Sequence, residues 1–88
     1  MYLVVDTNRR SIPVYRQIAD QLRYLILTGN IKPGESLPSS RHLSRFLKVN
    51  RKTILLAMKL LSEEGLVVSD GKRGYIANPN LRLPSPEA

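Results

Sequence analysis

Two stretches with the apolar spacing of a helix stand only three residues apart, and this separation restricts the possible folds more than any other feature. In the first, Leu43, Phe46 and Leu47 are spaced i, i+3 and i+4, which predicts a short helix ending near Leu47 with these three side chains facing the core. The second has the spacing i, i+3, i+4 and i+7, at Ile54, Ala57, Met58 and Leu61. Ser39 and Asn50 are suited to cap the two helices at their N-termini. The connection "KVN" is then as short as the turn of a helix-turn-helix motif.

A longer helix precedes this pair, over about residues 13–28. Its apolar positions form one stripe at i, i+3, i+4, i+7, i+10 and i+11, occupied by Tyr15, Ile18, Ala19, Leu22, Leu25 and Ile26. Pro13 suits the first helical turn, and Gly29 suits the end of the helix. Gly65 ends the third predicted helix, over residues 50–64, in the same way.

The segment "LVVSDGKRGYIA" predicts a β-hairpin, with strands at 66–69 and 74–77 and a turn at 70–71. "SLP" predicts a brief extended segment, because the residue before Pro38 is pushed out of the helical region. "YLVVD", residues 2–6, is β-prone and predicts an edge strand or an arm. The sequence therefore predicts a mainly α fold with a small β-hairpin, a winged helix-turn-helix of three helices plus wing. We expect an arm or short strand at 1–12, the winged domain at 13–77, and a linker or disordered tail at 78–88.

Composition excludes several function classes. The 88 residues suit one small domain without a deep active-site cleft. There is no cysteine, so disulfides and thiolate metal sites are excluded, and a reducing cytoplasm, the expected location, is compatible. A single histidine, His42, does not make a zinc site. No apolar stretch approaches the roughly 20 residues of a membrane span, and there is no signal-peptide pattern. We find no nucleophile–base pair or phosphate loop, and the adjacent Glu63 and Glu64 do not converge, so we expect no enzyme and no cofactor in this chain.

Charge gives the most direct indication of a partner. Fourteen Lys and Arg oppose seven Asp and Glu, a formal net charge of +7, which favours a polyanion such as nucleic acid or an anionic membrane. No acidic residue lies between Glu35 and Glu63. That interval contains six cations: Arg41, Arg45, Lys48, Arg51, Lys52 and Lys59. A solvated surface that is merely basic is the alternative, but such helices usually intersperse opposite charges three or four residues apart.

The third predicted helix starts with Arg51 and Lys52, although cations at a helix N-terminus cost about 0.3–1 kcal/mol each. The mismatch is resolved if a DNA phosphate lies there, since a recognition helix enters the major groove by its N-terminal residues. Arg51 is our first candidate for a base contact, bonding guanine O6 and N7. Asn50 either bonds adenine or caps the helix. Lys52 and Thr53 are candidates for phosphate contacts, with a backbone hydrogen bond as the alternative for Thr53.

Two further groups are candidates for DNA contact. Arg41 and Arg45 lie four residues apart on one helix face, suited to backbone phosphate or, alternatively, left as a hydrated pair. At the predicted wing tip, Gly71 permits close approach while Lys72 and Arg73 supply counter-ion release; the alternative is that the glycines serve only the turn.

The third predicted helix is also apolar outside its inward face. Leu55 lies off that face and either touches a thymine methyl or packs against the hairpin or a partner chain. Leu56 likewise has no place on the predicted core face.

Beyond these patterns, "YRQI", "ILTGNIKPGESLPSSR", "VNRKT" and "EEGLV" occur in an order that resembles the winged helix-turn-helix domain of GntR-type bacterial transcription regulators. The resemblance covers about residues 13–77. "PVYRQI" with "LPSSR" is similar to the subgroups whose second domain is a short helical tail or an aminotransferase-like domain that binds pyridoxal phosphate.

The resemblance implies operator recognition on double-stranded DNA, often as a repressor, by a homodimer on a roughly palindromic site. It implies DNA contacts at Ser39, at Arg41, at residues 50–53 and at the wing around Gly71, with any small-molecule effector bound by a C-terminal domain absent here. Because no such domain follows, we expect either a fragment, which the Pro-rich end favours, or a short stand-alone regulator. Family members usually have Ser-Arg-Thr-Thr at residues 50–53 and Gly-x-Gly-Thr in the wing, so the operator sequence is not predicted. A winged-helix protein-interaction or RNA-binding module is the alternative function, although exposed aromatics for base stacking are few.

Overall fold

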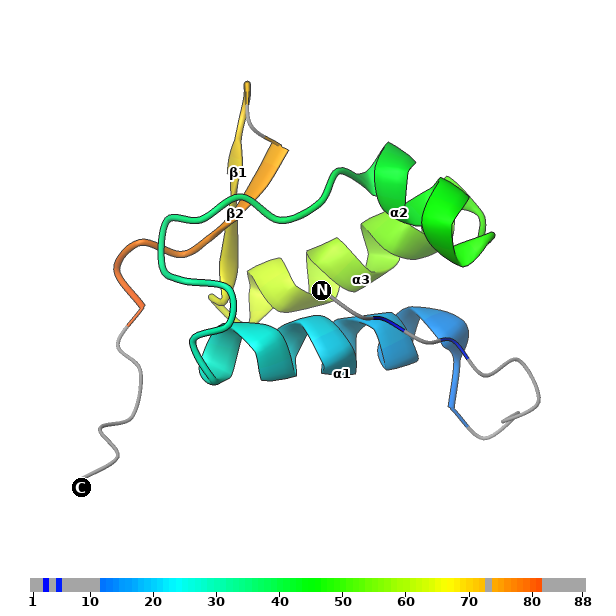
Figure 1. Ribbon diagram of the computed structural model, residues 1–88, viewed down its shortest axis with the longest axis horizontal. Helices are drawn as coiled ribbons and strands as arrows, with labels where there is room; N and C mark the ends of the chain where they lie inside the picture. The colour runs from blue at the N-terminus through cyan, green and yellow to red at the C-terminus, as the bar shows by residue number, and fades with distance from the viewer. Residues whose placement is uncertain (1–2, 4, 6–11, 73, 82–88) are drawn as a thin grey trace.

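A computed structural model describes residues 3, 5, 12–72 and 74–81. It contains α1 (Val14–Leu27), α2 (Ser40–Leu47), α3 (Arg51–Glu63), β1 (Val67–Asp70) and β2 (Gly74–Ala77). In Figure 1, α3 lies between α1 and α2, and the hairpin rises beside the C-terminal end of α3. This is the predicted arrangement of three helices plus a wing.

The core forms where the predicted apolar stripes of α1 and α3 meet. Both stripes are fully buried at four positions each: Ile18, Ala19, Leu22 and Ile26 in α1, and Ile54, Ala57, Met58 and Leu61 in α3. Leu43 from α2 and Val67 from β1 belong to the same core. Burial of this apolar surface, at roughly 25 cal/mol per Å², is the main term that holds such a small domain together.

The predicted core face of α2 is wrong at one position. Phe46 is 56% exposed, while Leu43 and Leu47 face the core, one fully buried and the other half-buried. The Phe46 ring instead stacks on the His42 ring, with centroids 6.2 Å apart. α2 ends at Leu47, and the following cap residue Lys48 has a positive φ of 57° that turns the chain. Val49 then packs against the core.

The wing is an antiparallel hairpin in which Val67 pairs with Ala77 and Asp70 with Gly74. β1 thus begins and ends one residue later than predicted. The predicted extended segment before Pro38 is present and pairs with the free edge of β2 through a bridge between Ser36 and Ile76. β2 is therefore hydrogen-bonded on both sides.

Both ends of the chain contribute to packing where they are described. In the predicted arm, Leu3 is buried in the core and Val5 packs against it; the other residues of 2–6 lie outside the described part. In the predicted tail, the Asn78 N–H donates to the Leu66 carbonyl at 2.9 Å, and Leu81 packs against the core. Residues 82–88 lie outside the described part. Among the described residues, none of the helices has the length and apolar composition of a membrane span.

Candidate nucleic-acid interface

The first turn of α3 presents two exposed cations, Arg51 and Lys52. Asn50 precedes them in an extended conformation, and its Oδ1 accepts a hydrogen bond from the Lys52 N–H at 2.8 Å. The capping role expected as one alternative for Asn50 is thus present. Thr53 is half-buried, and its backbone N–H donates to the Asn50 carbonyl at 2.9 Å. Lys52 and Arg51 are therefore held on a well-formed helix start with their charged groups in solvent.

Arg51 also joins the starts of two helices. Its Nε donates to the Ser40 Oγ at 3.0 Å, and Ser40 is the first residue of α2. The partner is a neutral hydroxyl, so the positive charge of Arg51 is not neutralised. The bond places the N-terminal ends of α2 and α3, both positive ends of helix dipoles, on one side of the molecule.

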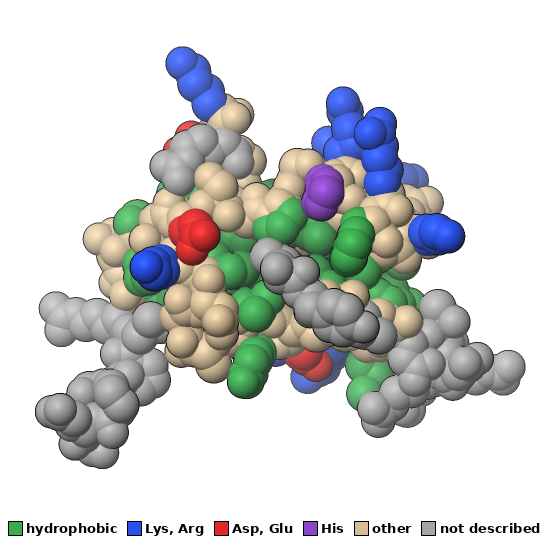
Figure 2. Space-filling model, in the orientation of Figure 1, with side chains coloured by type: hydrophobic (Ala, Val, Ile, Leu, Met, Phe, Trp, Pro, Cys, Tyr) green, Lys and Arg blue, Asp and Glu red, His purple; other side chains and the backbone are tan. Residues whose placement is uncertain are grey.

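α2 contributes the predicted arginines. Ser39 caps this helix, its Oγ accepting from the His42 N–H at 3.0 Å. Arg41 lies in the first turn and Arg45 one turn later, and both are exposed. Figure 2 shows basic side chains gathered over α2 and the turn that follows it, with another at the tip of the hairpin. The face seen in Figure 2 therefore carries two basic areas along one edge.

The backbone of the wing tip bears on the two roles that the sequence left open for its glycines, close approach to DNA and turn geometry. Gly74 has a positive φ of 76°, so its backbone conformation favours glycine. Gly71 has no positive φ, and an added Cβ there would meet nothing within 4 Å. Turn geometry thus accounts for Gly74 and not for Gly71. Lys72 is exposed, and its N–H donates to Asp70 Oδ1 at 3.4 Å; Arg73 lies outside the described residues.

A hollow of about 420 Å³ lies between the two helix starts and the wing. It is lined by Pro38, Ser39, Ser40, Arg51, Leu55, Gly71, Lys72, Gly74 and Tyr75. Four predicted site residues are brought together there: Ser39, Arg51, Gly71 and Lys72. The other described candidates, Arg41, Arg45, Asn50, Lys52 and Thr53, do not line it.

The lining also includes residues outside the predicted set of site residues. Leu55 is 39% exposed and lines the hollow, as does Tyr75 of the wing. Ser40 was not predicted as a site residue. Its only sequence signal is its place in "LPSSR", beside the cap residue Ser39. The hollow is therefore basic on two sides and apolar on a third.

The ion pairs of the described residues lie away from this hollow, and both involve Arg23. Its Nε and Nη2 donate to the two carboxylate oxygens of Glu64, each at 2.8 Å, and its Nη1 donates to Asp20. The hydrogen bond to Glu64, followed by that to Asp20, raises the pKa of Arg23. This clamp joins α1 to the C-terminal end of α3, and it leaves the cations of α2 and of the α3 start without a carboxylate partner in the described structure.

Comparison with known proteins identifies the family. The protein-family model described as "Bacterial regulatory proteins, gntR family" matches residues 14–76, most of the chain. The chain belongs to the GntR family. Its curated relatives include the HTH-type transcriptional repressor YtrA of Bacillus subtilis, 38% identical over 74 residues, covering 84% of this chain and 57% of that protein. The pyridoxine biosynthesis regulator PdxR of Corynebacterium glutamicum is 40% identical over 76 residues, covering 86% of this chain and 16% of that protein.

Solved GntR structures share the fold. YtrA from Sulfolobus acidocaldarius superposes with a TM-score of 0.82 at 40% identity, covering 91% of this chain and 67% of that one. The DNA-binding domain of AraR, solved in complex with an operator, gives a TM-score of 0.72 at 25% identity, covering 88% and 93%. The predicted function, the DNA-binding domain of a GntR-type transcription regulator, is confirmed, as is the expectation of a class without catalysis. The protein-interaction or RNA-binding alternative gains no support.

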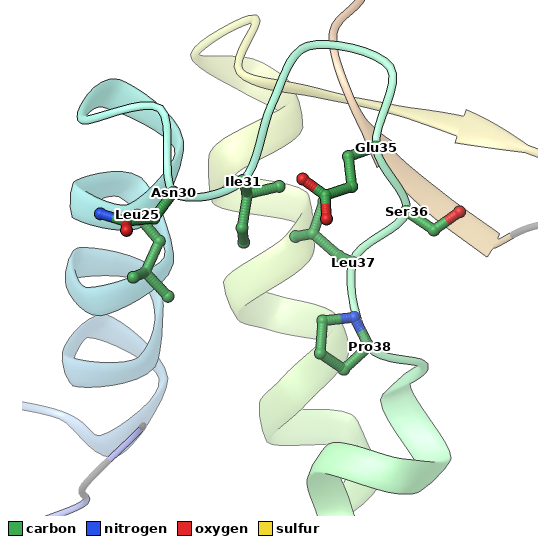
Figure 3. A pocket seen from close by; sticks show the side chains of 7 residues that line it. All are labelled: Leu25, Asn30, Ile31, Glu35, Ser36, Leu37 and Pro38. Atoms are coloured by element: carbon green, nitrogen blue, oxygen red, sulfur yellow. The ribbon is translucent and has the colours of Figure 1, made fainter. Parts of the chain in front are cut away.

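A second hollow of the GntR domain, of about 460 Å³, lies between the C-terminal end of α1 and the segment that leads to α2 (Figure 3). Leu25, Ile31 and Leu37 form its apolar part. Glu35 also lines it, and its Oε1 accepts from the Lys32 N–H at 2.7 Å. Among the residues that the structure describes, no three His, Cys, Asp or Glu side chains gather as metal ligands.

Proposed function

We propose that this GntR domain recognises its operator with the first turn of α3 in the DNA major groove and the wing, residues 70–75, near the minor groove. The observation that supports this proposal best is the hollow shared by Arg51, Ser39 and Lys72. Its walls come from the starts of both helices and from the wing tip, so a duplex in contact with one wall would meet the others. A major groove about 12 Å wide admits one helix at this place.

Electrostatics supports a polyanionic ligand at this face. Arg41, Arg45, Arg51 and Lys52 are exposed and make no ion pair within the described residues. Two helix dipoles add partial positive charge at the same edge. The phosphates of a duplex would offset the repulsion among these positive charges. Binding would also release condensed counter-ions from the duplex, which supplies most of the affinity of such contacts.

Residue roles follow from where the side chains lie. Arg51 is the proposed base-reading residue, because among the described residues only its Nε is engaged and its two terminal nitrogens remain available for guanine O6 and N7. Lys52, Arg41 and Arg45 are proposed to contact phosphates. Asn50 serves mainly as the helix cap. At the wing, Gly71 and Lys72, with Arg73, are proposed to approach the backbone of the duplex.

The whole protein is also proposed to act as a homodimer. The chain spans 57% of YtrA and 16% of PdxR, so these relatives are longer than the DNA-binding domain. We propose that the GntR domain works in the cytoplasm as one half of a dimer on a roughly palindromic operator. A small-molecule effector would act through a further domain and not through this one.

Salt dependence tests the proposal. Duplexes selected from a random pool with the 88-residue chain are titrated over a range of salt concentrations. We expect the logarithm of the association constant to fall linearly with the logarithm of salt, by about −0.9 for each neutralised phosphate. A slope near zero would contradict the proposal. Single-stranded RNA of equal length, measured in parallel, is expected to bind more weakly; equal or tighter binding would favour the RNA-binding alternative.

A further inference from the structure

We infer that Ser40 is a positioning residue for Arg51, and that it affects operator specificity through Arg51 rather than by reading a base itself. The inference rests on the proposed function, in which Arg51 reads a base. It concerns a contact between residues that lie 11 positions apart in the sequence and on different helices.

The contact holds one edge of the Arg51 guanidinium. Ser40 Oγ accepts from Arg51 Nε at 3.0 Å, and both residues line the same hollow. Ser40 is half-buried at the first position of α2, so its own place is set by the helix. With Nε engaged, the plane of the guanidinium is restrained, and Nη1 and Nη2 remain as a pair of parallel donors. Such a fork is the geometry that a guanine edge requires.

Restraint of this kind increases affinity by preorganisation. A free arginine side chain has about 2 kcal/mol of rotamer entropy, part of which is lost on binding. A hydroxyl that already holds Arg51 reduces the remaining loss, since less freedom is left to remove. A carboxylate at residue 40 would hold the guanidinium more tightly but would also cancel its charge. The neutral Ser40 hydroxyl restrains the side chain and leaves the full charge for DNA.

A double-mutant cycle tests this role on duplexes selected from a random pool with the unmodified chain. Ser40→Ala is expected to weaken binding by about 3- to 10-fold, which corresponds to the net contribution of one typical intramolecular hydrogen bond. In the Arg51→Ala background the same change is expected to have less than about a twofold effect, since coupled residues are non-additive. Ser40→Thr keeps a hydroxyl and is expected to retain most of the affinity. Ser62→Ala, an exposed serine at the other end of α3, is the matched control and is expected to have no effect.

Discrimination at the base separates positioning from a direct phosphate contact. The guanine assigned to Arg51 is replaced by 7-deazaguanine, which lacks the N7 acceptor. The penalty for this replacement is expected to shrink in Ser40→Ala and to return in Ser40→Thr. An unchanged penalty, or an equal loss from Ser40→Ala with and without Arg51, would overturn the inference. If the unmodified chain selects no sequence at all, the proposed function itself fails, whereas selective binding with an additive cycle sinks only the role of Ser40.

Discussion

At the scale of single residues, the start of α3 has two positive charges that oppose folding and that would favour binding in the proposed complex with DNA. Helix N-termini are stabilised by acids, yet the first turn of α3 contains none and presents Arg51 and Lys52 instead. Asn50 supplies the capping that the acids do not. A local preference is thus violated at the residues that we propose to face DNA, where violation is expected if the ligand is an anion.

Replacing Lys52 by Glu should separate these two effects. We expect Lys52→Glu to raise the free energy of unfolding by about 0.3–1 kcal/mol at low salt, because an acid there complements the helix dipole. Duplex affinity should fall at the same time, through charge repulsion. Lys59→Glu, also exposed but beyond the first turn, is the control and should bring no such gain in stability. Urea unfolding and duplex titration measure the two quantities, and a variant that binds as tightly as the unmodified chain would remove Lys52 from the interface.

At the scale of elements, the wing has a fixed base and an open tip. The Leu37 N–H donates to the Tyr75 carbonyl at 2.9 Å, and the Ala77 N–H donates to the Glu35 carbonyl at 2.9 Å, so β2 is held from the side opposite β1. At the tip, Gly71 and Lys72 are exposed. We expect a base held in this way to fix the position of the tip relative to α3, so that both could meet the same proposed ligand.

Two glycine substitutions distinguish the turn from the contact surface. Gly74→Ala is expected to lower the free energy of unfolding by about 1–2 kcal/mol, because its φ of 76° is unfavourable for a residue with a Cβ. Gly71→Ala should change stability by no more than about 0.5 kcal/mol, since its surroundings are open and its φ is not positive. If the DNA backbone approaches Gly71 closely, however, the added methyl should weaken duplex binding. Thermal unfolding and duplex titration of both variants measure these effects. If Gly71 had only a turn role, Gly71→Ala would lower the free energy of unfolding more than Gly74→Ala and would leave duplex affinity unchanged.

Predictability from the sequence also differs between elements. The stripes of α1 and α3 extend over two or more turns, so their direction toward the core is well determined and the structure confirms it. α2 has only eight residues, and three apolar positions do not determine which of its faces turns to the core. The prediction that Phe46 faces the core is therefore wrong. The extended segment before Pro38 follows from local sterics, but sterics do not say that it pairs with β2. The bond between Arg51 and Ser40 depends on how two helices cross, which no local pattern encodes.

At the scale of the whole molecule, charges of opposite sign are sorted by position. The formal charge is +7, and the ion pairs within the described residues both use Arg23, where α1 meets the C-terminal end of α3. The cations of α2 and α3, and Lys72 of the wing, are exposed. A molecule sorted in this way is attracted to DNA of any sequence, so its specificity depends on few base contacts. In the proposed dimer, one domain with one α3 would therefore read only a short half-site.

Two linked copies of the domain should consequently bind a palindromic operator more tightly than one copy. We expect a version dimerised by a coiled coil fused after Ala88 to bind a palindromic duplex at least about 100-fold more tightly than the single chain, because the second contact becomes intramolecular. The gain should peak at one separation of the half-sites. Adding about 5 base pairs to that separation turns one half-site to the opposite face of the duplex and should remove most of the gain in affinity. Titration of duplexes with stepwise spacers measures this dependence. Equal affinity of the dimerised and single chains at every spacing would contradict the proposed symmetric operator, while sequence preference of the single chain would still stand.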